Sequence, residues 1–227
     1  MHPDTLNFLK ALSENNNRNF FAIVKPLYDQ VREQLIAFTD DVISEIKKFD
    51  ESIDEDLTAK KCLFRIYRDA RRLKPWDPVY KKNFGFSISP SGKNDSRAGY
   101  YLHIQPKHSF FGGGTYRPEP SELLNLRHYL IRYADEYHKL IQNKNFVKEF
   151  WKVGGTSITR PPKGFFKDTP HLELIKKKQH LITHAYTDKE MSDPNFMNLF
   201  LHHCKIAMPW FHFLNKGYNY TERQHTL

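Results

Sequence analysis

The sequence is poor in cysteine and has no long hydrophobic run. Its only two cysteines, Cys62 and Cys204, do not make a disulfide framework and lack the paired spacing of a zinc site. No stretch approaches the roughly 18 consecutive apolar residues of a membrane span. The first residues carry no basic patch followed by an apolar run, so we expect no secretory signal and a cytoplasmic protein.

Aromatic and charged residues are plentiful. Phe, Tyr and Trp make up 15% of the chain, which predicts a folded protein with an aromatic core. The net charge of +9 is uneven: residues 1–58 carry 6 basic and 12 acidic residues, and residues 59–227 carry 29 and 14. This pattern predicts an acidic arm packed on a basic body, or a basic surface that attracts an anion or an acidic partner. A surface that serves solubility alone is an equal alternative.

The hydrophobic pattern changes period twice along the chain. Apolar residues recur at helical spacing in residues 1–58, where Pro26 predicts a kink or a fresh helix start. Strand alternation follows, first from Cys62 and then in residues 84–88 and 100–104, which a polar turn joins into a predicted antiparallel hairpin. Helical patterns return after Pro120.

These patterns predict an α+β fold. A central antiparallel sheet spans about residues 62–112, residues 179–186 are a candidate further strand, and N-terminal and C-terminal helices pack on the sheet. We expect a single domain over residues 1–227. Its parts are an acidic helical arm (1–58), a sheet with a basic motif (59–118) and a mainly helical part (119–214).

Three local signals predict where elements begin or end. Asn145 is typical of a helix N-cap, and Pro209 predicts the end of the last helix. The run Gly112–Gly114 lacks the spacing of a phosphate-binding loop and favours a tight turn with positive φ.

The densest basic segment begins at Arg65. Between residues 60 and 97 there are 11 Lys and Arg and three acidic residues. Arginine presents a rigid fork of donors that suits phosphate and carboxylate oxygens, and Asp69 is placed to orient Arg68 or Arg71. Two interpretations of this segment have equal weight. One is an anion-binding site, and the other is a structural network of arginines and carboxylates that reaches the acidic arm.

The same segment carries a family resemblance. Arg65, Arg68, Asp69, Arg71 and Tyr80 match the pattern RxxRDxRFxxx[DN]KxxY, and the segment resembles the signature of an uncharacterised bacterial family of domains of unknown function. Other similar pieces lie along nearly the whole chain: residues 8–10, 15–18, 100–104, 113–119 and 161–165. The resemblance implies a shared fold and brings no function with it.

Three positions depart from the family pattern. Arg72 stands where the pattern has Phe, and Trp76 and Asp77 stand where it has Asp or Asn followed by Lys. A positive charge has therefore become negative at Asp77. If that lysine contacts a ligand in relatives, the contact is lost or changed here, and a divergent activity follows as a hypothesis.

Histidines offer two further candidates. His103 shares the polar face of a predicted strand with Tyr101 and Gln105, where it is a candidate general acid or base, although a hydrogen-bonded structural histidine is the favoured alternative. His184 shares a strand face with His180, but the sequence has no HExxH pattern and no CxxC pair. We therefore expect no metal and no cofactor.

The sequence names no reaction, and two functional hypotheses stand. The first is a former or divergent enzyme that binds a phosphate-bearing or carboxylate-bearing ligand in a pocket formed by Arg65, Arg68, Asp69, Arg71, Tyr80, Lys81 and His103. The second is a non-catalytic protein that uses its basic face on nucleic acid or an acidic partner. Nucleic acid is less favoured because no known binding motif is recognisable, and we expect no membrane partner.

Overall fold

The computed structural model describes residues 1–69, 71, 73–74 and 76–221. The sequence departure at Arg72 therefore lies outside the described residues. The elements, in chain order, are α1 (Pro3–Glu14), α2 (Arg18–Lys47), α3 (Ala59–Cys62), β1 (Phe84–Ile88), β2 (Gly99–Ile104), β3 (Ser109–Thr115), α4 (Pro120–Arg132), α5 (Ala134–Ile141), α6 (Lys144–Phe150), α7 (Leu172–Ile175), β4 (His180–Tyr186), α8 (Asp188–Ser192) and α9 (Phe196–Tyr218). None of these helices is long and apolar enough to span a membrane.

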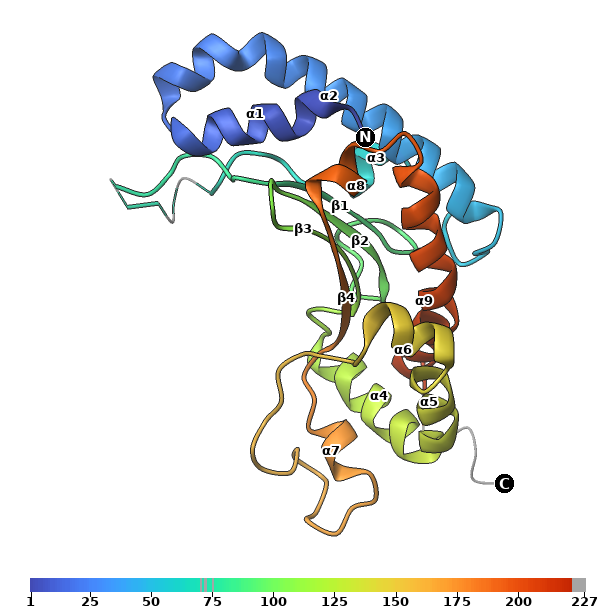
Figure 1. The fold of residues 1–227 in the computed structure, drawn as a ribbon. Helices are drawn as coiled ribbons and strands as arrows, with labels where there is room; N and C mark the ends of the chain where they lie inside the picture. Colours follow the sequence, from blue (N-terminus) through green and yellow to red (C-terminus); the bar gives the residue numbers. More distant parts are fainter. Residues whose placement is uncertain (70, 72, 75, 222–227) are drawn as a thin grey trace. The chain divides into compact units, whose positions relative to one another are not determined.

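An antiparallel sheet with the strand order β1-β2-β3-β4 confirms the predicted α+β fold (Figure 1). The hairpin of β1 and β2 and the further strand β4 lie where the sequence placed them. The described residues group into two compact units, and β2, β3 and β4 each give residues to both. Unit 1 consists of residues 1–93, 101–111 and 185–202, and unit 2 of residues 94–100, 112–184 and 203–227. A single domain over the whole chain stays a prediction.

In unit 1, the two N-terminal helices pack through aromatic rings on β1. Phe8 of α1 stacks on Phe84, with ring centroids 5.8 Å apart, and Phe38 of α2 lies 6.3 Å from Phe86. The apolar stripe of α2 recurs every three or four residues, so one face of the helix is buried against this core. Pro26 does not start a new helix: α2 runs through it along a curved path (Figure 1), because the stripe packs on both sides of the proline.

In unit 2, the C-terminal part of α9 supplies several large buried rings, of which Trp210 is the largest. Trp210 is fully buried against Phe146 of α6, with centroids 5.7 Å apart, and Phe213 lies 4.9 Å from Tyr129 of α4. The predicted end of the helix at Pro209 is wrong, because α9 continues to Tyr218. Pro209 faces solvent, where water can satisfy the carbonyl that loses its helical partner, and packing of the following rings maintains the helix.

Two helical boundaries of unit 2 also differ from the sequence pattern. The amphipathic stretch after Pro120 is divided at Tyr133 into α4 and α5. The N-cap of α6 is Asn143 instead of Asn145, and its side-chain oxygen accepts a hydrogen bond of 2.9 Å from the Asn145 backbone N–H. Both asparagines are typical cap residues, so composition alone did not choose between them.

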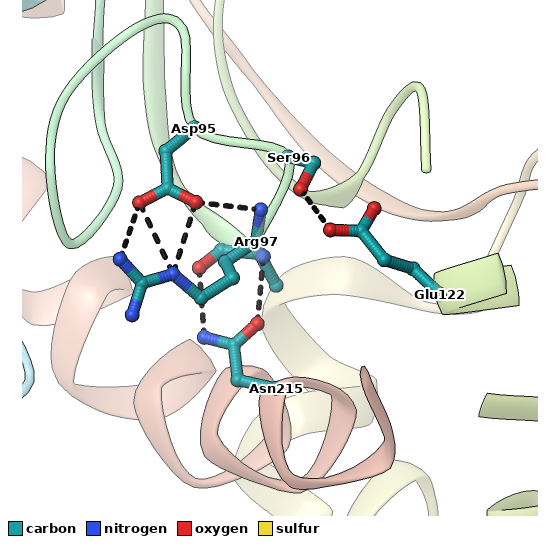
Figure 2. Close-up of polar contacts among 6 residues, drawn as sticks. Asp95, Ser96, Arg97, Glu122 and Asn215 are labelled. Carbon is teal, nitrogen blue, oxygen red and sulfur yellow. Dashed lines mark hydrogen bonds and ion pairs between the residues drawn. The ribbon is translucent and has the colours of Figure 1, made fainter. Parts of the chain in front are cut away.

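The segment before β2 is held by side chains from two helices of unit 2 (Figure 2). Ser96 donates a 2.6 Å hydrogen bond to Glu122 of α4, and Arg97 pairs with Asp95. The carboxamide of Asn215, on α9, accepts a hydrogen bond from the backbone N–H of Ala98 at 2.7 Å and donates one to its carbonyl at 3.1 Å.

The glycine run lies inside β3, so the predicted tight turn is wrong. Of its three glycines, Gly114 has a positive φ of 112°. A Cβ on Gly114 would meet the backbone carbonyl of His180, and one on Gly113 would meet the ring of Phe211. The run therefore lets β4 and α9 approach the strand closely. In the sequence, glycines required for such close packing look the same as glycines required for a turn.

Candidate functional site

The basic segment begins in an irregular ribbon of unit 1. Cys62 ends α3 instead of starting a strand, and the pairing beyond it is reduced to isolated antiparallel bridges, Leu63 with Phe86 and Tyr67 with Tyr80. The alternation that predicted a strand thus reflects extended backbone with too few ladder hydrogen bonds for a regular strand. Between the two residues of the second bridge, Tyr67 and Tyr80, runs a connection of which residues 68–69, 71, 73–74 and 76–79 are described.

A pocket with a volume of about 510 Å³ lies beside this connection. Its lining contains four of the seven residues proposed from the sequence, Arg68, Asp69, Tyr80 and Lys81. The other described lining residues, which sequence reasoning missed, are Leu73, Pro78, Lys82 and Asn83. Lys82 could have been predicted from the sequence, because it follows Lys81 at the end of the same basic segment.

Tyr80 is fixed from two directions. Its backbone N–H donates a 2.9 Å hydrogen bond to Oδ1 of Asn16, and its carbonyl accepts a 3.1 Å bond from Nδ2 of the same side chain. Its ring stacks on Phe21 of α2, with centroids 4.0 Å apart and planes 13° apart. Burial, followed by the nearby Tyr67, raises the pKa of Tyr80, and Arg18 opposes the shift. The wall of the pocket is therefore anchored to the connection between α1 and α2.

Replacing Asn16 with alanine tests this anchor. The change removes both hydrogen bonds to Tyr80, and at a net value of roughly 0.5–1.5 kcal/mol each we expect the free energy of unfolding to fall by about 1–3 kcal/mol. Urea denaturation of the purified chain measures it. The matched control is Asn15→Ala, at the neighbouring exposed position, which should change stability by less than about 0.5 kcal/mol. Equal losses in the two variants would contradict the anchoring role.

Two cations of the pocket are held by backbone carbonyls. Nη1 of Arg68 donates to the carbonyl of Pro78 at 3.3 Å, and Nζ of Lys81 donates to the carbonyl of Arg65 at 2.8 Å. Burial, followed by repulsion from Arg65, lowers the pKa of Lys81. Lys82 is exposed at the rim. The backbone thus positions the charges without neutralising them.

The other two arginines of the motif do not line the pocket. Arg71 donates from Nε and Nη2 to the carboxylate of Asp69, at 3.0 and 2.9 Å, and its side chain is 87% exposed. Arg65 is exposed and contributes its carbonyl to Lys81. Of the three arginines, Arg68 is therefore the one whose side chain contributes to the pocket lining.

His103 lies outside the pocket lining, with both ring nitrogens engaged. Nδ1 is 3.0 Å from the hydroxyl of Tyr101, Nε2 is 3.1 Å from Oε1 of Gln105, and the ring stacks on Phe110 with centroids 4.7 Å apart. Burial lowers the pKa of His103, and the hydrogen bond to Gln105 partly opposes this. The geometry favours a structural histidine over a general acid or base.

The two described departures from the family pattern also lie outside the lining. Trp76 is 78% exposed, with Nζ of Lys74 at 5.7 Å from its ring centroid. Asp77 accepts a 3.0 Å hydrogen bond from the backbone N–H of Lys74. The negative charge at Asp77 therefore stabilises the local turn.

Comparison with known proteins adds a family and nothing more specific. A family model described as "Conserved hypothetical protein (DUF2461)" matches residues 4–213. No curated protein matches the sequence. No solved structure matches it either. The family match confirms the resemblance seen in the basic segment, since it spans that segment and most of the chain.

Proposed function

We propose that this chain, which belongs to the conserved hypothetical protein family DUF2461, binds a small ligand bearing phosphate or carboxylate groups in the pocket around Arg68. The observation that carries the proposal is the lining itself, which contains Arg68, Lys81 and Lys82 together with Tyr80. The volume of about 510 Å³ is in the usual range for small-molecule sites. A cytoplasmic location is part of the proposal.

The charge balance of the lining favours an anion. Asp69 is the only carboxylate among the described lining residues, and Arg71, which is not in that lining, pairs with it. The positive charges of Arg68, Lys81 and Lys82 then exceed the negative charge of the lining. The described hydrogen bond of the Arg68 guanidinium involves one nitrogen, so its remaining donors suit a forked contact with phosphate or carboxylate oxygens.

Pyrophosphate and citrate are suitable probes, titrated into the purified chain by calorimetry. Arg68→Met should weaken binding of the preferred probe by about 10–100-fold, because one charge-assisted hydrogen bond contributes about 1.5–3 kcal/mol. Arg68→Lys should lose nearly as much, since lysine keeps the charge without the fork.

The matched control is Lys10→Met, which removes a positive charge at an exposed position of α1. This variant should bind within about twofold of the parent chain, because Lys10 is not among the described lining residues and salt weakens the effect of exposed charges. An equal loss in the Lys10 and Arg68 variants would show that net charge, and no defined pocket, attracts the anion.

Nucleic acid is the second candidate, favoured by exposed rings beside cations. Phe64, Tyr67 and Trp76 are 39%, 41% and 78% exposed, and Nζ of Lys81 lies 5.8 Å from the ring centroid of Phe64. Such rings can stack on the bases of a single strand. Oligonucleotide binding that falls steeply with salt and is lost in Trp76→Ala would favour this candidate over the small ligand.

A further inference from the structure

Unit 2 brings together three side chains with metal-binding chemistry. Glu149 lies near the end of α6, His184 in β4 and His203 in α9. Each offers one donor atom, and these atoms all lie within 4.8 Å of one another. The side chain of His203 is 1% exposed, that of Glu149 13% and that of His184 26%. The cluster is therefore mostly buried, and His184 is its most accessible member.

The spacing of the donor atoms suits a small cation. Oε2 of Glu149 lies 3.4 Å from Nε2 of His203 and 3.7 Å from Nδ1 of His184. Tetrahedral ligands at about 2.0–2.1 Å from Zn²⁺ stand roughly 3.3 Å apart. Small side-chain rotations would bring the atoms to that separation.

The backbone of α6 also positions one of the rings. Nδ1 of His184 lies 2.8 Å from the carbonyl oxygen of Glu149, and the ring centroids of His184 and His203 are 4.1 Å apart. Nδ1 is also the nitrogen that lies 3.7 Å from the Glu149 carboxylate, so the carbonyl contact and a metal ion would share one atom. Metal binding through Nδ1 therefore requires the neutral ring with its proton on Nε2, because a protonated nitrogen cannot be a ligand.

We propose that Glu149, His184 and His203 bind one transition-metal cation, with Zn²⁺ as the preferred ion. Imidazole nitrogens favour Zn²⁺ and its neighbours in the transition series, whereas Mg²⁺ and Ca²⁺ favour sites built from oxygen. Three protein ligands leave a coordination position open, as in zinc sites that bind water or substrate.

This inference differs from the sequence expectation of no metal. The ligands come from three elements far apart in the chain, so no short motif marks them. His203 lies on the buried face of α9, a position that is typical of core packing. A purely structural cluster, in which Glu149 accepts hydrogen bonds from the histidines, is the alternative that an experiment must separate.

The test uses the full chain without an affinity tag, stripped with a chelator and titrated with Co²⁺. We expect one ion per chain, a visible absorption band of low-symmetry Co²⁺, and displacement by Zn²⁺. Loss of groups that merely orient a ligand weakens metal binding by about 10–100-fold, so Glu149→Gln and His184→Gln should each weaken it at least that much. Zn²⁺ at about 100 times its dissociation constant should raise the melting temperature by roughly 5–10 °C.

The matched control is His202→Gln, which changes the exposed histidine next to His203 on α9. Its affinity for Co²⁺ should stay within about twofold of the parent chain. Circular dichroism of each metal-free variant checks the fold, and His184 is the safer ligand to replace because it is partly exposed. The proposal is overturned if no stoichiometric ion binds, or if folded Glu149 and His184 variants bind Co²⁺ as the parent does.

Discussion

Replacing Gly114 with alanine is expected to lower the free energy of unfolding by about 2–5 kcal/mol. The residue has a φ of 112°, and a left-handed backbone costs a residue with a Cβ roughly 1–2 kcal/mol. The added methyl group would also meet the His180 carbonyl of β4. Because that obstacle is backbone, relief requires the strands to move, and overpacking of this kind typically costs about 1–3 kcal/mol.

Gly164 provides a control that separates the two causes. Its φ is also positive, at 91°, but a Cβ there would have no atom of the described residues within 4 Å. Gly164→Ala should therefore lose only the backbone contribution of about 1–2 kcal/mol. Urea denaturation of both variants measures the difference. Equal losses of unfolding free energy would mean that β4 can move away from the methyl group without loss of stability. The close approach of β4 to Gly114 would then not be required.

Acid is expected to destabilise the protein through His180 by about 2–3 kcal/mol between pH 7.5 and pH 4.5. This histidine is completely buried, and burial, with smaller contributions from Lys177 and Arg127, lowers its pKa from 6.5 to about 3. The unfolded chain binds a proton below about pH 6.5, whereas the folded chain does not until about pH 3. The stabilisation from the neutral ring is thus complete above pH 6.5 and is lost progressively as the pH falls toward 3.

The measurement is the free energy of unfolding in urea at several pH values. His180→Phe removes the titrating group. Whatever its effect on stability at pH 7.5, the variant should lose about 2–3 kcal/mol less unfolding free energy than the parent chain between pH 7.5 and pH 4.5. The matched control is His108→Gln, at an exposed position, which should keep the slope of the parent chain. A parent slope that survives in the His180 variant would assign the acid sensitivity to other groups.

The fold was predictable where the pattern was strictly local. Alternation of apolar and polar residues in 84–88 and 100–104 predicted β1 and β2, and a long apolar stripe predicted α2. Predictions based on prolines and glycines were wrong where tertiary packing outweighed the local preference of the residue. Pro209 lies inside a helix whose following rings are buried, and Gly114 serves an approach of β4 that lies far away in sequence.

For the candidate site, the sequence predicted the segment involved but did not predict which side chains line the pocket. The motif pointed to the segment whose residues Arg68 and Tyr80 line the pocket, but it did not show that Arg71 pairs with Asp69 and is absent from the described lining. Side-chain direction depends on such short hydrogen bonds, which spacing in sequence does not determine. The proposed metal site could not be predicted from local sequence patterns, because Glu149, His184 and His203 come together only when α6, β4 and α9 pack.

Asn16 and Asn215, far apart in the sequence, make the same pair of hydrogen bonds to the backbone. Each carboxamide accepts from the backbone N–H and donates to the carbonyl of a single residue, Tyr80 or Ala98. This is the exchange that a paired residue of a neighbouring antiparallel strand would make. Each side chain therefore imitates one residue of a strand that the chain does not supply. Aspartate has the same shape but only acceptors, so substitution to aspartate would place a carboxylate oxygen against a carbonyl at either position.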